Sequence, residues 1–422
     1  MELTNFFSPK NIALIGASDH AEKVGGVLMK KLLEFKGETI PVNPKHSDIF
    51  GVKCYNSVEE YKGKIDLAII AIPAEFVLNN LEECGKKGIK NVIIVTAGFS
   101  EIGNIRAEKQ IWNMAKKYKM RFLGPNCFGI FNPSLNLDLT FANTTPKLGD
   151  VAFISQSGAL WSYMSDFSAG KFGFSGFVSL GNMADLDFSD FIEYFSKDAK
   201  TSSIVLYVEK LKNGKKFIEV CRECKKPIFA VKSGSSKEGE KAAFNHTGSL
   251  ATDYEIYRGA FKQARVELCS GLEEAFEKGS KRKFIHSTKQ KINLGKNVFI
   301  ITNAGGAGAL TSDYVSEKGI KLCSSNLKNP LDILGTAKSE DYKNALEKTK
   351  NFDGDSIIVI VTLQSMTDSE NIAKVVVNFA RTSKKNIVAL FLGGKSVESS
   401  LDILKKGRVS CFSTFSEFRE SL

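Results

Sequence analysis

One pattern occurs three times along this chain and limits its possible folds most strongly: a short apolar run, a turn of small residues, then a helical pattern. The apolar run and the turn of the three copies occupy residues 12–18, 151–158 and 298–308. Runs of Val, Ile and Leu without polar alternation are typical of parallel strands that are buried on both faces. Helical patterns between such runs indicate βαβ units. The sequence therefore predicts three α/β domains in tandem.

Further strand-like runs follow each copy, separated by helical patterns. They lie at 39–42, 65–72, 91–96 and 121–123, then at 177–180, 203–208 and 227–231, and finally at 356–363 and 386–392. Beyond Gly407 we expect a last strand and a short helix. The polar stretch 132–146 and the Lys-rich stretch 278–296 are the expected joints between domains.

The length and the first residues indicate the class and the compartment of the protein. A chain of 422 residues suits two or three domains. Its apolar runs are too short to span a membrane, so we expect no membrane partner. The first residues show neither the basic nor the apolar region of a signal peptide, so we expect a cytoplasmic protein.

Charge and cysteine usage argue against two further classes. The chain carries 58 Lys and Arg against 47 Asp and Glu, a formal charge of +11. The lysines are spread along the sequence rather than clustered, so we expect no nucleic-acid partner. Cys221 and Cys224 are the only close cysteine pair, and no second pair completes a zinc site. We therefore expect no metal on this chain.

The first turn, Gly16-Ala17-Ser18, follows a strand as a nucleotide-binding turn does, with Gly25 further along. A dinucleotide fingerprint needs a second glycine where Ser18 stands, and an acid after the second strand. The sequence has Asn43-Pro44-Lys45 there instead. A lysine suits a phosphorylated ribose, so these residues disfavour NAD and favour NADP or coenzyme A. A plain tight turn remains the alternative.

In the middle third, a histidine and a carboxylate accompany a second anion-binding turn. His246 lies in a loop of small residues, unlike the three other histidines. Ser157 and Gly158 open a helix directly after a strand, which favours phosphate binding. Glu209 ends a neighbouring strand and would orient the imidazole. The combination predicts phosphoryl transfer through a histidine, with a purely structural His246 as the alternative.

Two rival motifs are incomplete. Residues 234–239 have the glycine spacing of a P-loop, but Glu240-Lys241 stands where Lys followed by Ser or Thr is required. Ser157 lacks the flanking glycines of a serine-hydrolase elbow.

Five segments in a fixed order carry a resemblance over essentially the whole chain. They are 8–18 (SPKNIALIGAS), 123–129 (LGPNCFG), 154–160 (ISQSGAL), 244–251 (FNHTGSLA) and 329–332 (NPLD). The chain resembles the family of α subunits of ADP-forming acetyl-CoA synthetase, also called acetate–CoA ligase. This family belongs to the NDP-forming acyl-CoA synthetases, which are related to succinyl-CoA ligase.

The resemblance implies a Rossmann-like CoA-binding domain at 1–131, a flavodoxin-like domain at 147–280, and a second flavodoxin-like, CoA-ligase-like domain at 296–422. It implies His246 as the phosphorylated residue, Glu209 as its carboxylate, and Ser157 and Gly158 as phosphate ligands. The implied CoA-binding residues are Gly16, Ala17, Ser18, Gly25, Asn43, Lys45 and Pro73, with Asn126 and Cys127 near the thiol end.

The implied reaction is acyl-CoA, with acetyl-CoA expected, plus ADP and phosphate giving carboxylic acid, CoA and ATP, reversibly. Acyl phosphate and phosphohistidine are its intermediates. The chain shows no ATP-grasp pattern, so ADP or ATP and Mg²⁺ are expected on a β subunit, in an α2β2 assembly. Phe244 and the turn Ala304-Gly305-Gly306 depart mildly from the family pattern and put the acyl preference in doubt.

Three alternatives stay open at this point. A succinyl-CoA ligase α subunit normally ends after the second domain, so residues 297–422 argue against it. A non-catalytic CoA-binding regulatory protein would not form phosphohistidine. An NADP-dependent oxidoreductase would need a hydride-transfer site, which the sequence does not indicate.

Overall fold

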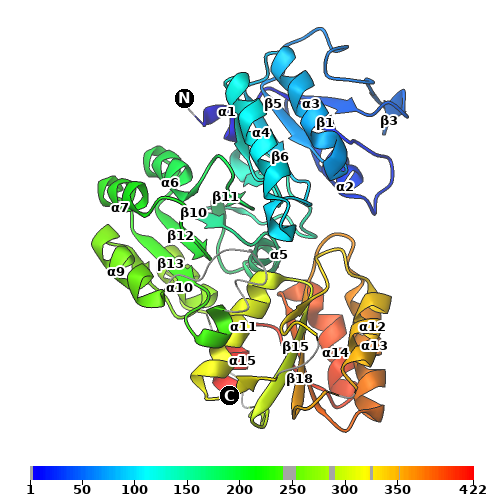
Figure 1. The fold of residues 1–422 in the computed structure, drawn as a ribbon, viewed down its shortest axis with the longest axis vertical. Coiled ribbons are helices and arrows are strands. Elements are labelled where there is room, and N and C mark those ends of the chain that lie inside the picture. Colours follow the sequence, from blue (N-terminus) through cyan, green and yellow to red (C-terminus); the bar gives the residue numbers. More distant parts are fainter. Residues whose placement is uncertain (1–2, 241–252, 285–289, 324–326, 351) are drawn as a thin grey trace.

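Each of the three repeated patterns lies in a mainly parallel sheet of its own with helices on both faces (Figure 1). The structure, a computed structural model, describes residues 3–240, 253–284, 290–323, 327–350 and 352–422. We call each sheet with its helices the first, second and third unit. The expected α/β class is confirmed, and the predicted strands 203–208 and 386–392 coincide with strands of the structure.

The first sheet has the order β2-β1-β5-β6-β7, all parallel. Its strands are β1 (Asn11–Ile15), β2 (Glu38–Val42), β5 (Leu67–Ile70), β6 (Asn91–Ile94) and β7 (Arg121–Leu123). Its helices are α1 (Thr4–Phe7), α2 (Val24–Leu32), α3 (Ala74–Lys86), η1 (Ser100–Ile102) and α4 (Ile105–Lys117), and β3 (Asp48–Ile49) pairs with β4 (Val52–Lys53) beside them.

The second sheet has the order β14-β13-β12-β10-β11-β8-β9. Its strands are β8 (Ile130–Asn132), β9 (Leu137–Asp138), β10 (Leu148–Ser155), β11 (Phe174–Ser179), β12 (Ser203–Val208), β13 (Ile228–Lys232) and β14 (Glu267–Leu268). Its helices are η2 (Pro133–Leu135), α5 (Ala159–Phe167), α6 (Phe188–Lys197), α7 (Gly214–Glu223), α9 (Tyr254–Ala264) and α10 (Leu272–Ser280). β8 and β9 add antiparallel strands at one edge, so the stretch expected to be a joint contributes to this sheet.

The third sheet has the order β16-β15-β18-β19-β20, with β17 also paired to β15. Its strands are β15 (Asn297–Thr302), β16 (Lys321–Leu322), β17 (Leu331–Asp332), β18 (Ser356–Thr362), β19 (Asn386–Leu392) and β20 (Ser410–Phe412). Its helices are α11 (Gly305–Glu317), α12 (Ser339–Lys348), α13 (Ser369–Thr382), η3 (Lys395–Val397), α14 (Glu398–Lys406) and α15 (Phe415–Ser421). The last strand and helix beyond Gly407 are those predicted.

Apolar packing joins the units in series. One cluster of buried side chains runs from the first sheet and α2 to α6 and α7 of the second unit. Another runs from α5 and α10 of the second unit to α11 and α15 of the third. Burial of these faces, worth roughly 25 cal/mol per Å² of apolar area, holds the three units against one another.

Three buried carboxylates also connect the second and third units. Asp166 of α5 accepts the main-chain N–H of Gly394 at 2.6 Å. Glu273 of α10 accepts that of Phe415 at 2.8 Å. Asp313 of α11, in the third unit, accepts the main-chain N–H of Gly234, in the second unit, at 2.7 Å. The carboxylates thus set the relative position of the two units.

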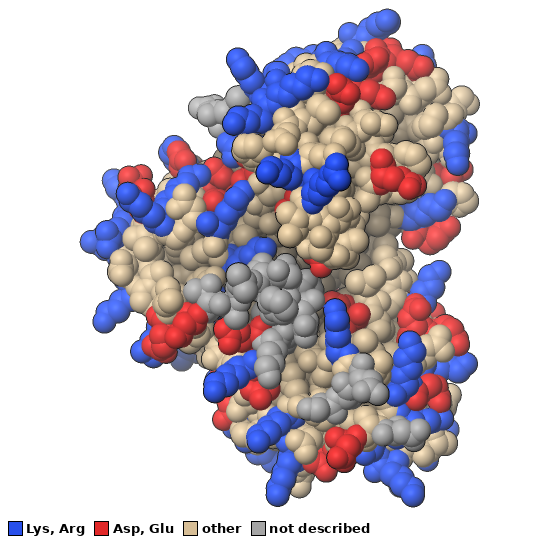
Figure 2. Space-filling model, viewed as in Figure 1, with Lys and Arg blue, Asp and Glu red and all other residues tan. Residues whose placement is uncertain are grey.

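Charged side chains are mixed on the visible face of the molecule. Figure 2 shows lysines and arginines over all three units, interspersed with acidic residues rather than gathered in one stripe. Within the described residues, none of the helices is both long and apolar enough to cross a membrane.

Candidate functional site

The turn after β1 is shaped by two glycines. Gly16 has φ +92°, and a Cβ there would lie 2.4 Å from the carbonyl oxygen of Ala71. A Cβ on Gly25 would lie 1.9 Å from the carbonyl oxygen of Gly16. Side chains at either position would collide with main chain, so the glycines let α2 begin directly against the turn.

Other residues of the first unit that were predicted to contact CoA follow β2 and β5, the two strands that flank β1. They therefore lie at the same carboxyl edge of the sheet as the turn after β1. The Asn43 side chain donates to the carbonyl oxygen of Ala17 at 2.8 Å and accepts from the Lys45 N–H at 3.0 Å. Ser18 is buried, whereas Lys45 and Pro73 are exposed. The structure therefore brings these residues to one edge of the sheet, with the Lys45 cation at its rim.

Asn126 and Cys127 follow β7 at the far end of the first sheet. Cys127 is buried, and its thiol donates to the carbonyl oxygen of Ile94 at 3.3 Å. Burial raises the pKa of this thiol to about 12, so the sulfur is unreactive at neutral pH. Contact of Cys127 with a ligand would have to come from its main chain. Asn126 is half-buried, and its amide donates to Asn182 at 3.3 Å.

Ser157 and Gly158 stand at the beginning of α5, as predicted. The Ser155 hydroxyl donates to the carbonyl oxygen of Ser157 at 2.7 Å, which fixes the turn. A Cβ on Gly158 would lie 2.4 Å from the Cβ of Phe128, a residue of the loop that carries Asn126. The helix N-terminus thus contacts the end of the first unit. Its first-turn amides offer an anion-binding position.

Glu209 lies directly after β12, one strand from Ser157. The side-chain oxygen of Gln156 accepts the main-chain N–H groups of Glu209 and Lys210, at 2.7 and 2.8 Å. Glu209 is 7% exposed. Burial and then the Glu209 charge raise the pKa of Tyr207 far above its usual value, so the Tyr207 hydroxyl stays protonated beside the carboxylate. His246 lies outside the described residues, and its pairing with Glu209 stays a prediction.

Sequence reasoning did not assign a role in the site to the N-terminus of α11. A Cβ on Gly306 would lie 2.7 Å from both Cβ and Oγ of Ser157. The Tyr207 hydroxyl donates to the Gly306 carbonyl oxygen at 3.2 Å. Among the described residues, no side chain caps the first turn of α5 or of α11. The third copy of the strand–turn–helix pattern was the signal that could have identified this element.

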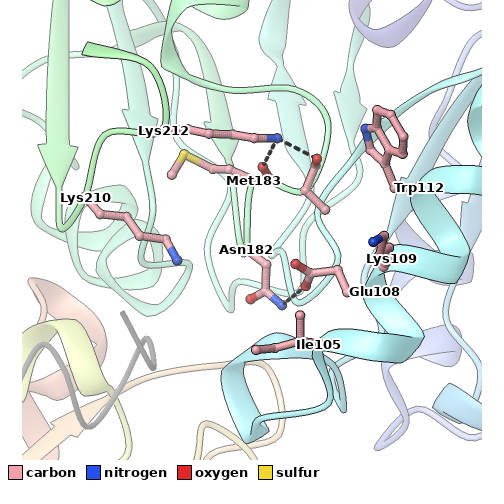
Figure 3. A pocket seen from close by; sticks show the side chains of 9 residues that line it. Ile105, Glu108, Lys109, Trp112, Asn182, Met183, Lys210 and Lys212 are labelled. Carbon is pink, nitrogen blue, oxygen red and sulfur yellow. Dashed lines mark hydrogen bonds between the residues drawn. The ribbon is translucent and has the colours of Figure 1, made fainter. Parts of the chain in front are cut away.

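A groove of about 590 Å³ opens between α4 and the loops that follow β11 and β12. Figure 3 shows Trp112, Glu108 and Ile105 of α4 on one side and Met183, Lys210 and Lys212 on the other. The amide of Asn182 donates to Glu108 at 2.7 Å within it. Asn182, which lines the groove, accepts from Asn126, and Lys210, which also lines it, follows Glu209 in the chain. The groove therefore lies next to the loops that carry Asn126 and Glu209.

Comparison with known proteins gives matches in both of the first two units. Residues 10–133 match the CoA binding domain family, and residues 148–279 match the succinyl-CoA ligase like flavodoxin domain family.

Several curated relatives match nearly the whole chain, among them the following two. The α subunit of ADP-forming acetate–CoA ligase II from Pyrococcus furiosus is 40% identical over 97% of this chain and 94% of its own. The ADP-forming acetate–CoA ligase from Methanocaldococcus jannaschii is 41% identical over 98% of this chain, which spans 61% of that relative.

A solved structure agrees over the full length. Acetyl-coenzyme A synthetase 1 from Ca. Korarchaeum cryptofilum, determined with phosphate and ADP, is 33% identical. It matches with a TM-score of 0.64 and covers 100% of this chain and 95% of its own. From these matches and the arrangement of its units, the chain belongs to the family of ADP-forming acetate–CoA ligase α subunits.

Proposed function

We propose that this chain is the α subunit of an enzyme that converts acyl-CoA, ADP and phosphate into carboxylic acid, CoA and ATP, reversibly, with acetyl-CoA as substrate. The observation that carries the proposal is the meeting of three loops from three units. Phe128 contacts Gly158, and Gly306 contacts Ser157, so the predicted thiol end of CoA and the predicted phosphate cradle are adjacent.

CoA would bind across the carboxyl edge of the first sheet, within a domain at 1–131. Gly16, Ala17, Ser18 and Gly25 would approach it with main chain, because the turn leaves little room for side chains. Asn43 supports this turn, Lys45 would meet the ribose phosphate, and Pro73 would line the nucleotide. The pantetheine arm would then pass Asn126 and the main chain of Cys127 along the groove toward Glu209.

Phosphoryl transfer would occur between the N-termini of α5 and α11, in the domains 147–280 and 296–422. A phosphate oxygen attacks the thioester carbon, the carbon–sulfur bond breaks, and CoA leaves as the thiol. A His246 nitrogen then attacks the phosphorus of the acyl phosphate, and the carboxylate leaves. Ser157, Gly158 and the first turn of α11 would stabilise the phosphoryl oxygens, and Glu209 would orient the imidazole.

The nucleotide steps would take place on a partner. We propose a β subunit with an ATP-grasp fold, in an α2β2 assembly, that supplies the ADP or ATP site and its Mg²⁺. The P. furiosus relative supports a partner subunit, because that relative is itself named as an α subunit.

The test is phosphate labelling of the chain with its β subunit. With Mg²⁺ and ATP labelled on the γ-phosphate, we expect an acid-labile, base-stable label on the α chain, and none without the β subunit. His246→Ala should abolish this label and leave CoA binding intact. The matched control, His46→Ala in the first unit, should label normally.

Two outcomes would contradict the proposal. A stable His246→Ala chain that still supports ATP formation would exclude the histidine from the reaction. CoA binding without any label in the complete assembly would favour the non-catalytic CoA-binding protein.

A further inference from the structure

Asn182 lies in the loop after β11, where the second unit contacts the loop that carries Asn126. The main-chain N–H of Asn182 donates to the carbonyl oxygen of Pro125 at 2.9 Å. A Cβ on the preceding residue, Gly181, would lie 2.3 Å from the same oxygen. The two loops are therefore in direct contact, and their main chain fixes the position of Asn182 relative to Asn126.

The side chain of Asn182 contacts two carboxylates of the first unit. Its amide nitrogen donates to Glu101 of η1 at 2.6 Å and to Glu108 of α4 at 2.7 Å, and Figure 3 shows the second of these bonds. A carboxylate only accepts hydrogen bonds, so Asn182 has to face both acids with its nitrogen. Its oxygen is then left for Asn126, whose amide nitrogen donates to it at 3.3 Å.

Glu101 cannot turn away from Asn182 without losing other hydrogen bonds. One of its oxygens accepts the main-chain N–H groups of Gly98 and Phe99, the latter at 3.0 Å. The other oxygen is the one that accepts from Asn182. The order of donors and acceptors from the acid to Asn182 is therefore set by the main chain of the first unit.

The main chain of Asn126 is also held in place. Its N–H donates to the carbonyl oxygen of Thr96 at 2.9 Å. Its φ of +55° lies in the left-handed region, which asparagine adopts more readily than most residues. The main chain thus places the side chain beside Asn182, and the remaining choice is which end of the Asn126 amide faces it. The two ends differ chemically, because the nitrogen donates and the oxygen accepts.

We propose that Asn182 is a positioning residue for the thiol end of CoA: it turns the Asn126 amide so that the nitrogen faces Asn182 and the oxygen is left to accept from the ligand. CoA carries donors at this end, namely the amide N–H nearest its sulfur and, once the acyl group has left, the thiol itself. An amide oxygen accepts from such donors, whereas an amide nitrogen would oppose them. The inference rests on the proposed function and adds a residue that acts through Asn126.

The experiment compares two ligands on the full chain by calorimetric titration: CoA, and phosphoadenosine diphosphate, which is the nucleotide half of CoA. Asn182→Ala removes the link to Asn126. Glu101→Gln keeps the size of the side chain but reverses its polarity. Because its oxygen stays with the main-chain N–H groups, its new amide nitrogen faces the nitrogen of Asn182. The matched control is Asn371→Ala, since the Asn371 amide likewise donates to a carboxylate, Asp368, but in the third unit.

We expect Asn182→Ala and Glu101→Gln each to weaken CoA by roughly 5- to 20-fold, the effect of one or two lost hydrogen bonds, and to change binding of the nucleotide half less than about twofold. In the assembly with the β subunit, the KM for acetyl-CoA should rise by a similar factor, with kcat changed less. Asn371→Ala should match the wild type in each measurement.

A double-mutant cycle tests whether Asn182 acts through Asn126. Asn126→Ala should weaken CoA about as much as Asn182→Ala does. The double variant should lose no more than either single variant, because both changes remove the same oriented amide.

Four results would overturn the inference: CoA binding by Asn182→Ala equal to that of the wild type, normal CoA binding by Glu101→Gln, additive losses in the cycle, or equal losses for CoA and its nucleotide half. If Asn182→Ala does not fold, Glu101→Gln decides alone. A wild-type chain that does not bind CoA would instead contradict the proposed function, so the two failures are distinguishable.

Discussion

At the scale of single residues, some residues of the first unit shape the turn after β1, and one exposed side chain, Lys45, is placed to contact a ligand. Gly25 and Asn43 hold the turn after β1 by close packing and by a hydrogen bond to Ala17. Lys45 is exposed at the rim of the same edge. We expect Lys45→Glu to weaken CoA by roughly 10-fold or more and dephospho-CoA much less, because the change places a carboxylate where the ribose phosphate would lie.

Calorimetric titration of the two ligands measures this difference. Lys36→Glu makes the same charge change at another exposed position and serves as the control for long-range electrostatics. Equal losses for CoA and dephospho-CoA would show that Lys45 does not recognise that phosphate.

At the scale of elements, α11 extends the site from the second unit into the third. Its first turn lies against Ser157, and only the missing side chain of Gly306 permits this approach. Gly306→Ala would place a methyl group 2.7 Å from Ser157, so the first turns of α5 and α11 must move apart. We expect phosphoryl transfer to fall by roughly 10²-fold while CoA binding to the first unit is retained.

Gly259→Ala is the control for this prediction, since nothing lies within 4 Å of a Cβ at that position of α9. Alanine there should raise the free energy of unfolding by roughly 0.5–1 kcal/mol and leave the rate unchanged. A normal rate of phosphohistidine formation in Gly306→Ala would argue that α11 has no part in the transfer.

At the scale of the whole molecule, the site depends on how firmly the second and third units are joined. Asp166 is 4% exposed and accepts the N–H of Gly394 at 2.6 Å and a hydrogen bond from the hydroxyl of Ser396. Asp166→Ala leaves these donors without their acceptor inside the interface. We expect a loss of about 1–3 kcal/mol in the free energy of unfolding.

Thermal unfolding of Asp166→Ala and of Asp402→Ala, an exposed acid of α14, measures this loss. The first should unfold several degrees lower than the second. Equal midpoints would show that the carboxylate contributes little to holding the units together.

Many of the strands and turns follow from local residue patterns, so the sequence alone was enough to predict them. Buried parallel strands such as 203–208 are continuous apolar runs, and the turns after β1, β10 and β15 contain the small residues that a tight approach requires. Residues at strand ends could also be assigned to one edge, because parallel strands end on the same side of a sheet. These rules placed Lys45, Ser157, Gly158 and Glu209 correctly at strand ends. The pairing of His246 with Glu209 stays a prediction from the sequence.

The rest was decided by contacts between residues far apart in the chain, which no local pattern encodes. The resemblance implied that Cys127 lies near the thiol end of CoA, and the structure shows that its own sulfur is buried and donates to the carbonyl oxygen of Ile94. The contact of Gly306 with Ser157 depends on how two apolar helix layers meet, and so does the bridge from Asp313 to Gly234. The chemistry of each residue was visible in the sequence, but its neighbours were set by the tertiary packing of three separately patterned units.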